Sequence, residues 1–234
     1  MQCKRTSESQ PGGQTTILEV VNLECVRGDR RLFRDVTFSL TPGTLLQLTG
    51  PNGSGKTSLL RIISGLVSPE SGEIRWQGAP VRTLAEEYSR SVTYIGHRTA
   101  VKEELSSLEN LRIANGLSGT SISSGEAQQA LAKVGLAGRE NLPARFLSEG
   151  QRRRSALARL LICRTTLWLL DEVLASLDRA AGSLIESIIG EHLNKGGIAI
   201  VATHQELHIS TDSFQRLELA AVSYSEAVSP RLPL

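Results

Sequence analysis

The sequence predicts an α/β fold in which a helical subdomain interrupts a core of strands and helices. Two Leu-rich apolar runs, Thr44–Leu48 and Leu167–Leu170, have the length and composition of buried strands. A glycine-rich loop and then a helical pattern follow the first run. Between residues 98 and 164 helix-start signals replace the strand patterns, which indicates that helices are inserted into the core.

The first part of the core alternates strands with turns. Apolar and alternating runs predict strands at Ile17–Asn22, Val36–Leu40, Thr44–Leu48 and Glu73–Trp76. Turn residues separate these strands at Pro42-Gly43 and at Pro69–Gly72. One helix belongs to this part, at Thr57–Ser64, where the apolar residues keep helical spacing.

The inserted part carries two helix-start signals. Ser106–Glu109 and Ser123–Glu126 are capping boxes, each with a serine three residues before a glutamate. The second part of the core then has predicted strands at Leu167–Leu170 and Ile198–Ala202, on either side of a long helix at Arg179–Asn194. We therefore expect a single domain over residues 17–220, with a core (17–97 and 165–220) and a helical subdomain (98–164). Residues 1–16 are expected to be a disordered lead-in, and residues 221–234 a C-terminal tail.

The glycine-rich loop matches the phosphate-binding pattern G-x-x-x-x-G-K-[ST]. Its residues are Gly50, Pro51, Asn52, Gly53, Ser54, Gly55, Lys56 and Thr57, and Ser58 follows them. The glycines permit left-handed backbone, so that successive amide groups can converge on a phosphate with no Cβ in the way. Lys56 would reach the β- and γ-phosphates, and the Thr57 hydroxyl would bind Mg²⁺. The flanking strand and helix supply the context that the motif requires, so the sequence predicts binding of a nucleoside triphosphate.

Composition limits the alternatives. With 234 residues, of which 40% are hydrophobic, the chain has enough apolar residues for a sizeable core, and its formal net charge of +2 gives no support for a nucleic-acid partner. Cys3, Cys25 and Cys163 match no metal or redox pattern, which is typical of reduced thiols in a cytosolic environment. No secretory signal is expected, and no apolar run approaches the roughly 20 residues of a membrane span.

Motifs in the second half indicate which kind of nucleotide-binding protein this is. Leu147–Gln151 precede a basic helical run, Asp171-Glu172 end a predicted strand, Ala175–Asp178 follow, and Thr203-His204 end the next strand. In this order, behind a phosphate loop, they resemble the signature, Walker B carboxylates, D-loop and switch histidine of the ATP-binding-cassette (ABC) ATPases. The resemblance runs from about residue 17 to about residue 215. It implies a phosphate-loop NTPase fold, with a RecA-like core sheet, an antiparallel β subdomain and an inserted α-helical subdomain.

The resemblance also implies a role for each motif. Asp171 would hold Mg²⁺, Glu172 would orient or deprotonate the attacking water, and His204 would sense the γ-phosphate of ATP. The further nucleotide-binding residues would be Ser148, Glu149, Gly150 and Gln151 of the signature, Asp178 of the D-loop, and His97 at the joint between the subdomains. In the family the signature contacts the ATP bound by the other copy, which implies a homodimer with two ATP molecules between its subunits.

Departures from the general pattern indicate a narrower family. At the joint, where most cassette ATPases have glutamine, the chain has Tyr94-Ile95-Gly96-His97, and a tryptophan, Trp168, lies in the strand before Asp171. These features and the segment Leu105–Leu111 resemble the haem-exporter ATP-binding subunits of cytochrome c maturation. The resemblance implies a peripheral protein on the cytoplasmic face of the inner (plasma) membrane, bound to the integral membrane subunits of a haem-delivery complex.

Other departures bear on the site. Val173 replaces the usual proline after the carboxylate pair, which removes a fixed φ beside Glu172. Glu149 replaces a glycine or alanine in the signature, and its carboxylate should point away from the γ-phosphate. Arg27 stands where an aromatic residue commonly stacks on adenine, and it either stacks there or faces solvent. At least two of the three arginines Arg152–Arg154 are expected to lie on a solvated helix face.

The expected function is that of an ATP-hydrolysing subunit that drives haem export or release of a haem-loaded chaperone. Two alternatives remain at this point. The chain would otherwise be the ATPase of another transporter, for lipid, drug or peptide, or a soluble ATPase that clamps an assembly without moving cargo across a membrane. The sequence does not separate them, because cargo contacts would lie in other chains.

Overall fold

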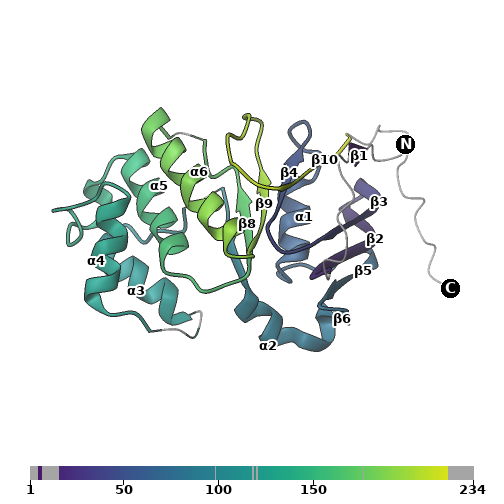
Figure 1. Cartoon of the computed structure of the whole chain (residues 1–234), viewed down its shortest axis with the longest axis horizontal. Helices are drawn as coiled ribbons and strands as arrows, with labels where there is room; N and C mark the ends of the chain where they lie inside the picture. Colours follow the sequence, from purple (N-terminus) through teal and green to yellow (C-terminus); the bar gives the residue numbers. More distant parts are fainter. Residues whose placement is uncertain are drawn as a thin grey trace.

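A computed structural model describes residues 5–6, 16–97, 99–117, 119, 121–175 and 177–220. A six-stranded sheet runs through the core (Figure 1). In spatial order its strands are β1 (Arg5–Thr6), β10 (Ser213–Glu218), β4 (Thr44–Thr49), β9 (Ile198–Ala202), β8 (Leu167–Asp171) and β7 (Val92–Ile95). All neighbouring pairs are parallel except β1 with β10. Every residue of β8 and β9 is buried, as their continuous apolar runs require.

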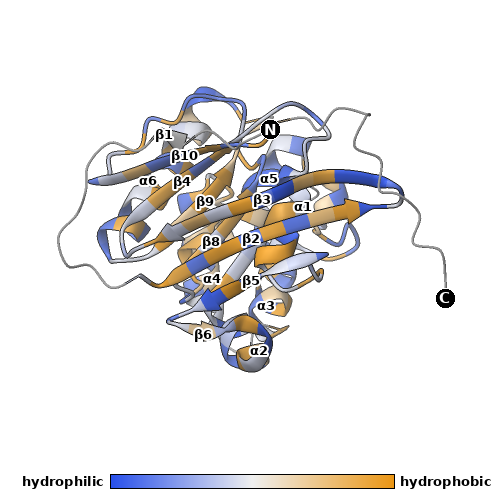
Figure 2. Ribbon diagram, turned by 90° about the vertical axis from the view of Figure 1, so that its right-hand side faces the viewer, coloured by the Kyte–Doolittle hydropathy of each residue, from blue (hydrophilic) through white to orange (hydrophobic). Residues whose placement is uncertain are grey.

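A second sheet of four antiparallel strands packs over one face of the first. Its strands, in spatial order, are β3 (Arg30–Leu40), β2 (Leu18–Arg27), β5 (Ser71–Trp76) and β6 (Ala79–Pro80). Figure 2 shows this sheet in front of the parallel strands. The largest apolar cluster includes residues of both sheets and of α1 (Lys56–Ile63), so that α1 is held at the base of the phosphate loop.

A second apolar cluster lies on the other face of the parallel sheet. It joins α6 (Arg179–Asn194) to β8 and β9, through side chains such as Ile185, Ile189 and Val201. The helix has the bounds that the sequence predicts. It begins at the N-cap Asp178, whose Oδ1 accepts a hydrogen bond from the Ala181 amide, and it ends before Gly196, which has a φ of 83°.

The helical subdomain forms a separate cluster at one end of the molecule (Figure 1). Its elements are α3 (Ser107–Leu117), α4 (Ser124–Lys133), η1 (Ala144–Phe146), α5 (Glu149–Leu157) and η2 (Ala158–Leu161). Both predicted capping boxes are present. Glu109 accepts hydrogen bonds from the Ser106 amide and hydroxyl, and Ser123 and Glu126 exchange the equivalent pair at the start of α4.

The structure differs from the expected elements in several places. β2 and β3 are longer than predicted, β5 already begins at Ser71 within the expected turn, and helix α2 (Val81–Ser91) and strands β6, β7 and β10 are not predicted. Arg5–Thr6 pair with Leu217 and Arg216 as β1, so this part of the expected disordered lead-in is ordered by backbone hydrogen bonding to the edge strand β10. The rest of residues 1–15 and the tail 221–234 lie outside the described residues. Within the described residues, no helix has the length and apolar character needed to cross a membrane.

Candidate nucleotide-binding site

The predicted site residues of the core meet at one edge of the six-stranded sheet. Because β4, β7, β8 and β9 are parallel, their carboxyl ends lie at the same edge. The phosphate loop follows β4, and the joint residues Gly96-His97 follow β7. Asp171-Glu172 lie at the end of β8, and Thr203-His204 follow β9.

The phosphate loop has the left-handed backbone that its glycines predict. Gly50, Gly53 and Gly55 have φ angles of 136°, 79° and 100°. A Cβ at Gly50 would lie 2.4 Å from the carbonyl oxygen of Leu219, so only glycine fits there. Gly55 is the N-cap of α1 and offers no side-chain cap, which leaves the first amide groups of this helix for a ligand.

The Lys56 side chain lies inside the phosphate loop. It is 7% exposed, and its Nζ donates hydrogen bonds to the carbonyl oxygens of Gly50 (2.7 Å) and Pro51 (3.3 Å). The same Nζ lies 3.1 Å from Nε2 of His204. These contacts hold the ammonium group at the centre of the loop, where a phosphate would find it.

Thr57 and Asp171 form the candidate metal site. The Thr57 hydroxyl donates a hydrogen bond to Asp171 Oδ2 at 2.8 Å, and the Tyr94 hydroxyl lies 3.4 Å from the same oxygen. Asp171 is 1% exposed, and its Oδ1 is buried without a hydrogen-bond partner among the described residues. An orphaned carboxylate oxygen beside a hydroxyl fits Mg²⁺, which is usually held by one or two carboxylates together with phosphate oxygens and water. No group of three or more His, Cys, Asp or Glu residues in the described residues could hold a metal alone.

Glu172 and His204 face each other across the edge. His204 Nε2 lies 3.5 Å from Glu172 Oε1 and 3.2 Å from Asn52 Oδ1, so this histidine links the loop to the carboxylate pair. Glu172 has a φ of 53°, in the left-handed region, and its amide donates a hydrogen bond to the Ala202 carbonyl oxygen at 2.9 Å. A non-glycine residue held in this region is a local strain that often marks a functional position.

The signature residues lie on a different subdomain. Ser148 is the N-cap of α5, and it forms a capping box with Gln151. Glu149 and Gly150 follow in the first turn, and Ser148 and Glu149 are exposed. Among the described residues, no hydrogen bond joins Leu147–Gln151 to the phosphate loop, so the structure does not bring these two groups together within one chain.

The joint at His97 and the D-loop lie near the signature. His97 is exposed, and it lines a cavity of about 490 Å³ with Glu149, Arg152 and Ala175, so that the joint, the signature and the D-loop share one cavity. Asp178 acts as the cap of α6 described above. Ser176 of the D-loop lies outside the described residues.

Arg153 is the arginine of the three that does not lie on a solvated helix face. It is 5% exposed, whereas Arg152 and Arg154 are half-buried, and its guanidinium donates hydrogen bonds to the carbonyl oxygens of Glu172, Val173 and His97. Burial lowers the pKa of this guanidinium, and the nearby charges of Asp171, Glu149 and Glu172 oppose that shift.

A signal for the burial of Arg153 is present in the sequence. Ala156, Leu157 and Leu160 are buried, and they follow Arg153 at spacings of three, four and seven residues, on the same helix face. Tyr94 is the other contact to the carboxylates that sequence reasoning does not assign. Of the remaining departures, Val173 is fully buried and Arg27 is exposed.

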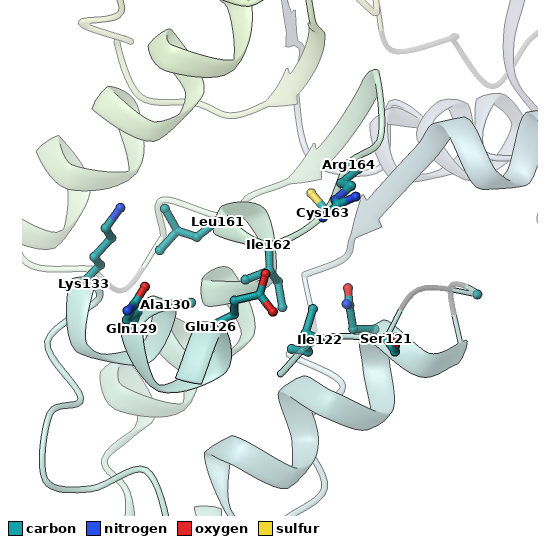
Figure 3. Close-up of a pocket in the computed structure, with 12 residues that line it drawn as sticks. Ser121, Ile122, Glu126, Gln129, Ala130, Lys133, Leu161, Ile162, Cys163 and Arg164 are labelled. Atoms are coloured by element: carbon teal, nitrogen blue, oxygen red, sulfur yellow. The ribbon is translucent and has the colours of Figure 1, made fainter. Parts of the chain in front are cut away.

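Another cavity, of about 560 Å³, lies within the helical subdomain (Figure 3). Glu126, Gln129 and Lys133 of α4 line one side, and Cys163 and Arg164 line another. None of the predicted site residues lines this cavity, so it is separate from the candidate nucleotide site.

Comparisons with known proteins agree with the geometry. A family model described as "ABC transporter" matches residues 33–175. The chain is 52% identical over 202 residues to a cytochrome c biogenesis ATP-binding export protein CcmA of Nitrosospira multiformis, covering 86% of this chain and 98% of that protein. It is also 52% identical to the CcmA protein of Nitrosomonas europaea, over 87% of this chain and 96% of that one. Among solved structures, a putative ABC transporter ATP-binding protein of Pyrococcus furiosus matches 86% of this chain and 96% of its own, with a TM-score of 0.73 and 27% identity.

Proposed function

Because the chain belongs to the ABC transporter family, where it is an ATP-binding ATPase subunit, we propose that its ATP hydrolysis drives an export step of cytochrome c biogenesis. The step would be haem export or the release of a haem-loaded chaperone. One observation carries the proposal: relatives named for cytochrome c biogenesis export share half of their residues with this chain over nearly their whole length.

The geometry at the sheet edge supports the hydrolytic part of the proposal. The amide groups of the phosphate loop and Nζ of Lys56 would bind the β- and γ-phosphates, with Thr57 and Asp171 holding the metal. Bound Mg²⁺ would neutralise charge on the phosphates and polarise the γ-phosphoryl group. The Glu172 carboxylate would orient the attacking water and accept its proton. His204, which already contacts Lys56 and Glu172, would hydrogen-bond the γ-phosphate.

A homodimer would complete each site. The helix start at Ser148 belongs to the helical subdomain, and its exposed position leaves it free to meet the phosphates bound by a second copy. Two ATP molecules would then lie between two chains. His97, in the same cavity as Glu149, would report the state of this shared site to the helical subdomain.

The proposed location is the cytoplasmic face of the inner (plasma) membrane. The partners would be integral membrane subunits of a haem-delivery complex, such as CcmB- and CcmC-like proteins. The two alternatives are the ATPase of a transporter for lipid, drug or peptide, and a soluble ATP-gated assembly clamp.

Co-purification from detergent-solubilised membranes tests this assignment. The tagged full-length chain should bring out hydrophobic membrane proteins, and mass spectrometry of the captured proteins should find the cytochrome c biogenesis subunits among them. Capture of a different transporter's membrane subunits would favour the first alternative. Recovery of soluble partners alone would favour the clamp.

A further inference from the structure

Arg153 is a buried cation whose partners are backbone carbonyl groups. Its Nη2 lies 2.5 Å from the Glu172 carbonyl oxygen, and its Nε lies 3.3 Å from that of Val173. Its Nη1 lies 2.5 Å from the His97 carbonyl oxygen and 3.5 Å from that of Gly96. Among the ion pairs of the described residues none includes Arg153, so these carbonyl groups supply its hydrogen-bond acceptors.

The four carbonyl groups belong to two segments that are far apart in the sequence. Glu172 and Val173 form the turn after β8, and Gly96 and His97 form the joint after β7. Arg153 itself comes from α5, which begins at the signature residue Ser148. A planar guanidinium with five donors suits such a contact, because it can bind two segments at once in a fixed geometry.

The contact fixes the backbone around Val173. The Glu172 carbonyl belongs to the peptide group before Val173, and the Val173 carbonyl belongs to the peptide group after it. Holding both oxygens therefore restricts φ and ψ of Val173, where the usual proline would fix φ through its ring. Glu172, immediately before, has a left-handed φ of 53°, so the direction of its side chain depends on this turn.

We propose that Arg153 is a positioning residue that holds the Glu172 carboxylate in its catalytic direction and ties that direction to the joint at His97. The inference rests on the proposed role of Glu172 in hydrolysis. Movement of α5 relative to the core displaces the guanidinium, and through it both the turn and the joint. Hydrolysis is thereby coupled to the position of the helical subdomain.

Steady-state kinetics of the full-length protein with Mg·ATP test the proposal, together with direct measurement of nucleotide affinity. Arg153→Gln should lower kcat about tenfold to a hundredfold, because a small displacement of a catalytic group has an effect of that size. Its Kd for ATP should stay within about threefold of wild type, since the phosphate loop is untouched. Arg153→Lys keeps the positive charge but lacks the planar guanidinium with its five donors, so its kcat should lie between those of Arg153→Gln and wild type.

Two further variants separate positioning from general damage. Arg90→Gln is the matched control, because the Arg90 side chain of α2 is 69% exposed and forms a surface ion pair with Glu86 at 2.6 Å, and its kcat should stay within about twofold of wild type. Val173→Pro, introduced into Arg153→Gln, should raise kcat at least threefold above that of Arg153→Gln alone, since the proline ring replaces part of the missing restraint on φ. A merely structural role predicts no such rescue.

Each outcome decides the question. Equal kcat in Arg153→Gln and Arg90→Gln overturns the proposal. So does a kcat loss in Arg153→Gln that Val173→Pro does not restore. Should Arg153→Gln fail to fold, the same comparison between Arg153→Lys and its Val173→Pro double variant decides. Glu172→Gln is measured in parallel. If it retains turnover, the proposed role of Glu172 is wrong and so is the Arg153 proposal. If it loses turnover while Arg153→Gln has no effect on kcat, the Arg153 proposal alone is wrong.

Discussion

Glu172 combines two properties that a catalytic carboxylate needs. Its side chain is about one-quarter exposed, so water can reach it, and its backbone is fixed on both sides by hydrogen bonds to Ala202 and Arg153. Neighbouring Asp171 is instead fully buried and bonded to Thr57. Two adjacent carboxylates thus have different environments, which suits one for the metal and the other for water.

Replacing Glu172 by glutamine should therefore stop turnover and leave binding intact. The amide cannot accept the proton of the attacking water, and general-base steps typically contribute 10²–10⁴-fold. Lys56, Thr57 and Asp171 are unchanged in Glu172→Gln, so ATP should bind and the protein should accumulate as a nucleotide-bound dimer. ATPase assays and size-exclusion chromatography with ATP measure the two effects. Turnover within threefold of wild type would remove Glu172 from the mechanism.

His97 should matter more for coupling than for stability. Its side chain is exposed, and Arg153 binds its backbone carbonyl, which alanine retains. His97→Ala should therefore unfold at nearly the same temperature as wild type. It should reduce ATP hydrolysis that is stimulated by the membrane partner more than basal hydrolysis. An equal loss in both activities would point to a local role at the metal or water instead.

At this scale the sequence predicts residues that share a motif role better than contacts that depend on how the subdomains pack. The phosphate-loop glycines have the left-handed backbone that the motif predicts, and Thr57 and Asp171, both assigned to Mg²⁺, lie in contact. The burial of Arg153 depends on how α5 packs against the turn after β8. Its charge alone suggests that the side chain is exposed to solvent, and its helical spacing to Leu157 and Leu160 is the local signal for burial.

At the scale of elements, β8 and α6 are joined by an aromatic stack. The rings of Trp168 and His192 are stacked, with their centroids 3.7 Å apart and their planes almost parallel, at 4°. His192 Nε2 also lies 3.1 Å from the Thr166 carbonyl oxygen and 3.3 Å from that of Ile198. A Cβ at Gly197 would overlap the same ring, so the end of α6 fits closely against β8 and β9.

This stack predicts a loss of stability at low pH. Burial lowers the pKa of His192, so between its unfolded value of about 6.5 and its lower folded value the unfolded chain binds more protons. The free energy of unfolding should fall as pH decreases through that window, by at most about 1.4 kcal/mol per pH unit from this residue. His192→Phe keeps a stacked ring and removes the titration. Urea titrations from pH 7.5 to about pH 5 should show that the free energy of unfolding depends less on pH in the variant than in wild type. An identical pH dependence in both would show that His192 does not cause the loss of stability.

Secondary structure was predictable where apolar spacing was regular. α6 has helical spacing with an N-cap and a glycine at its end, and β8 and β9 are continuous apolar runs, so their predicted bounds agree with the structure to within one residue. α2 is not predicted because its apolar stripe has only three members, Val81, Leu84 and Tyr88, and its backbone is kinked between them at Ala85. β2 and β3 were predicted too short because register shifts between Val20 and Val26 interrupt the alternation of side chains.

For the whole molecule, the separation of the signature from the phosphate loop governs what one chain can do. The loop and carboxylates occupy the sheet edge, and Ser148 starts a helix in the other subdomain. The fold class followed from the order of strands, loop and inserted helices. The dimer and the membrane subunits leave no comparable trace in one chain, because their contacts are completed by side chains of other molecules.

The biological assignment is tested by removing the charge at the phosphate loop. Lys56→Ala eliminates the ammonium group that would bind the β- and γ-phosphates, while the glycine backbone and the apolar core beneath α1 remain. Lys195→Ala, which changes an exposed lysine at the end of α6, serves as the control.

Cells that carry only Lys56→Ala should lack c-type cytochromes detected by covalent haem staining. They should still contain b-type haem proteins, because haem synthesis does not pass through the proposed complex. Cells with Lys195→Ala should stain normally, which separates the loss of phosphate binding from a general loss of protein. The contrast between the two kinds of cytochrome carries more weight than the loss itself, since any severe energy defect lowers both. Normal c-type cytochromes together with failed transport of another solute would refute the haem-export assignment and leave the chain as the ATPase of a different ABC transporter.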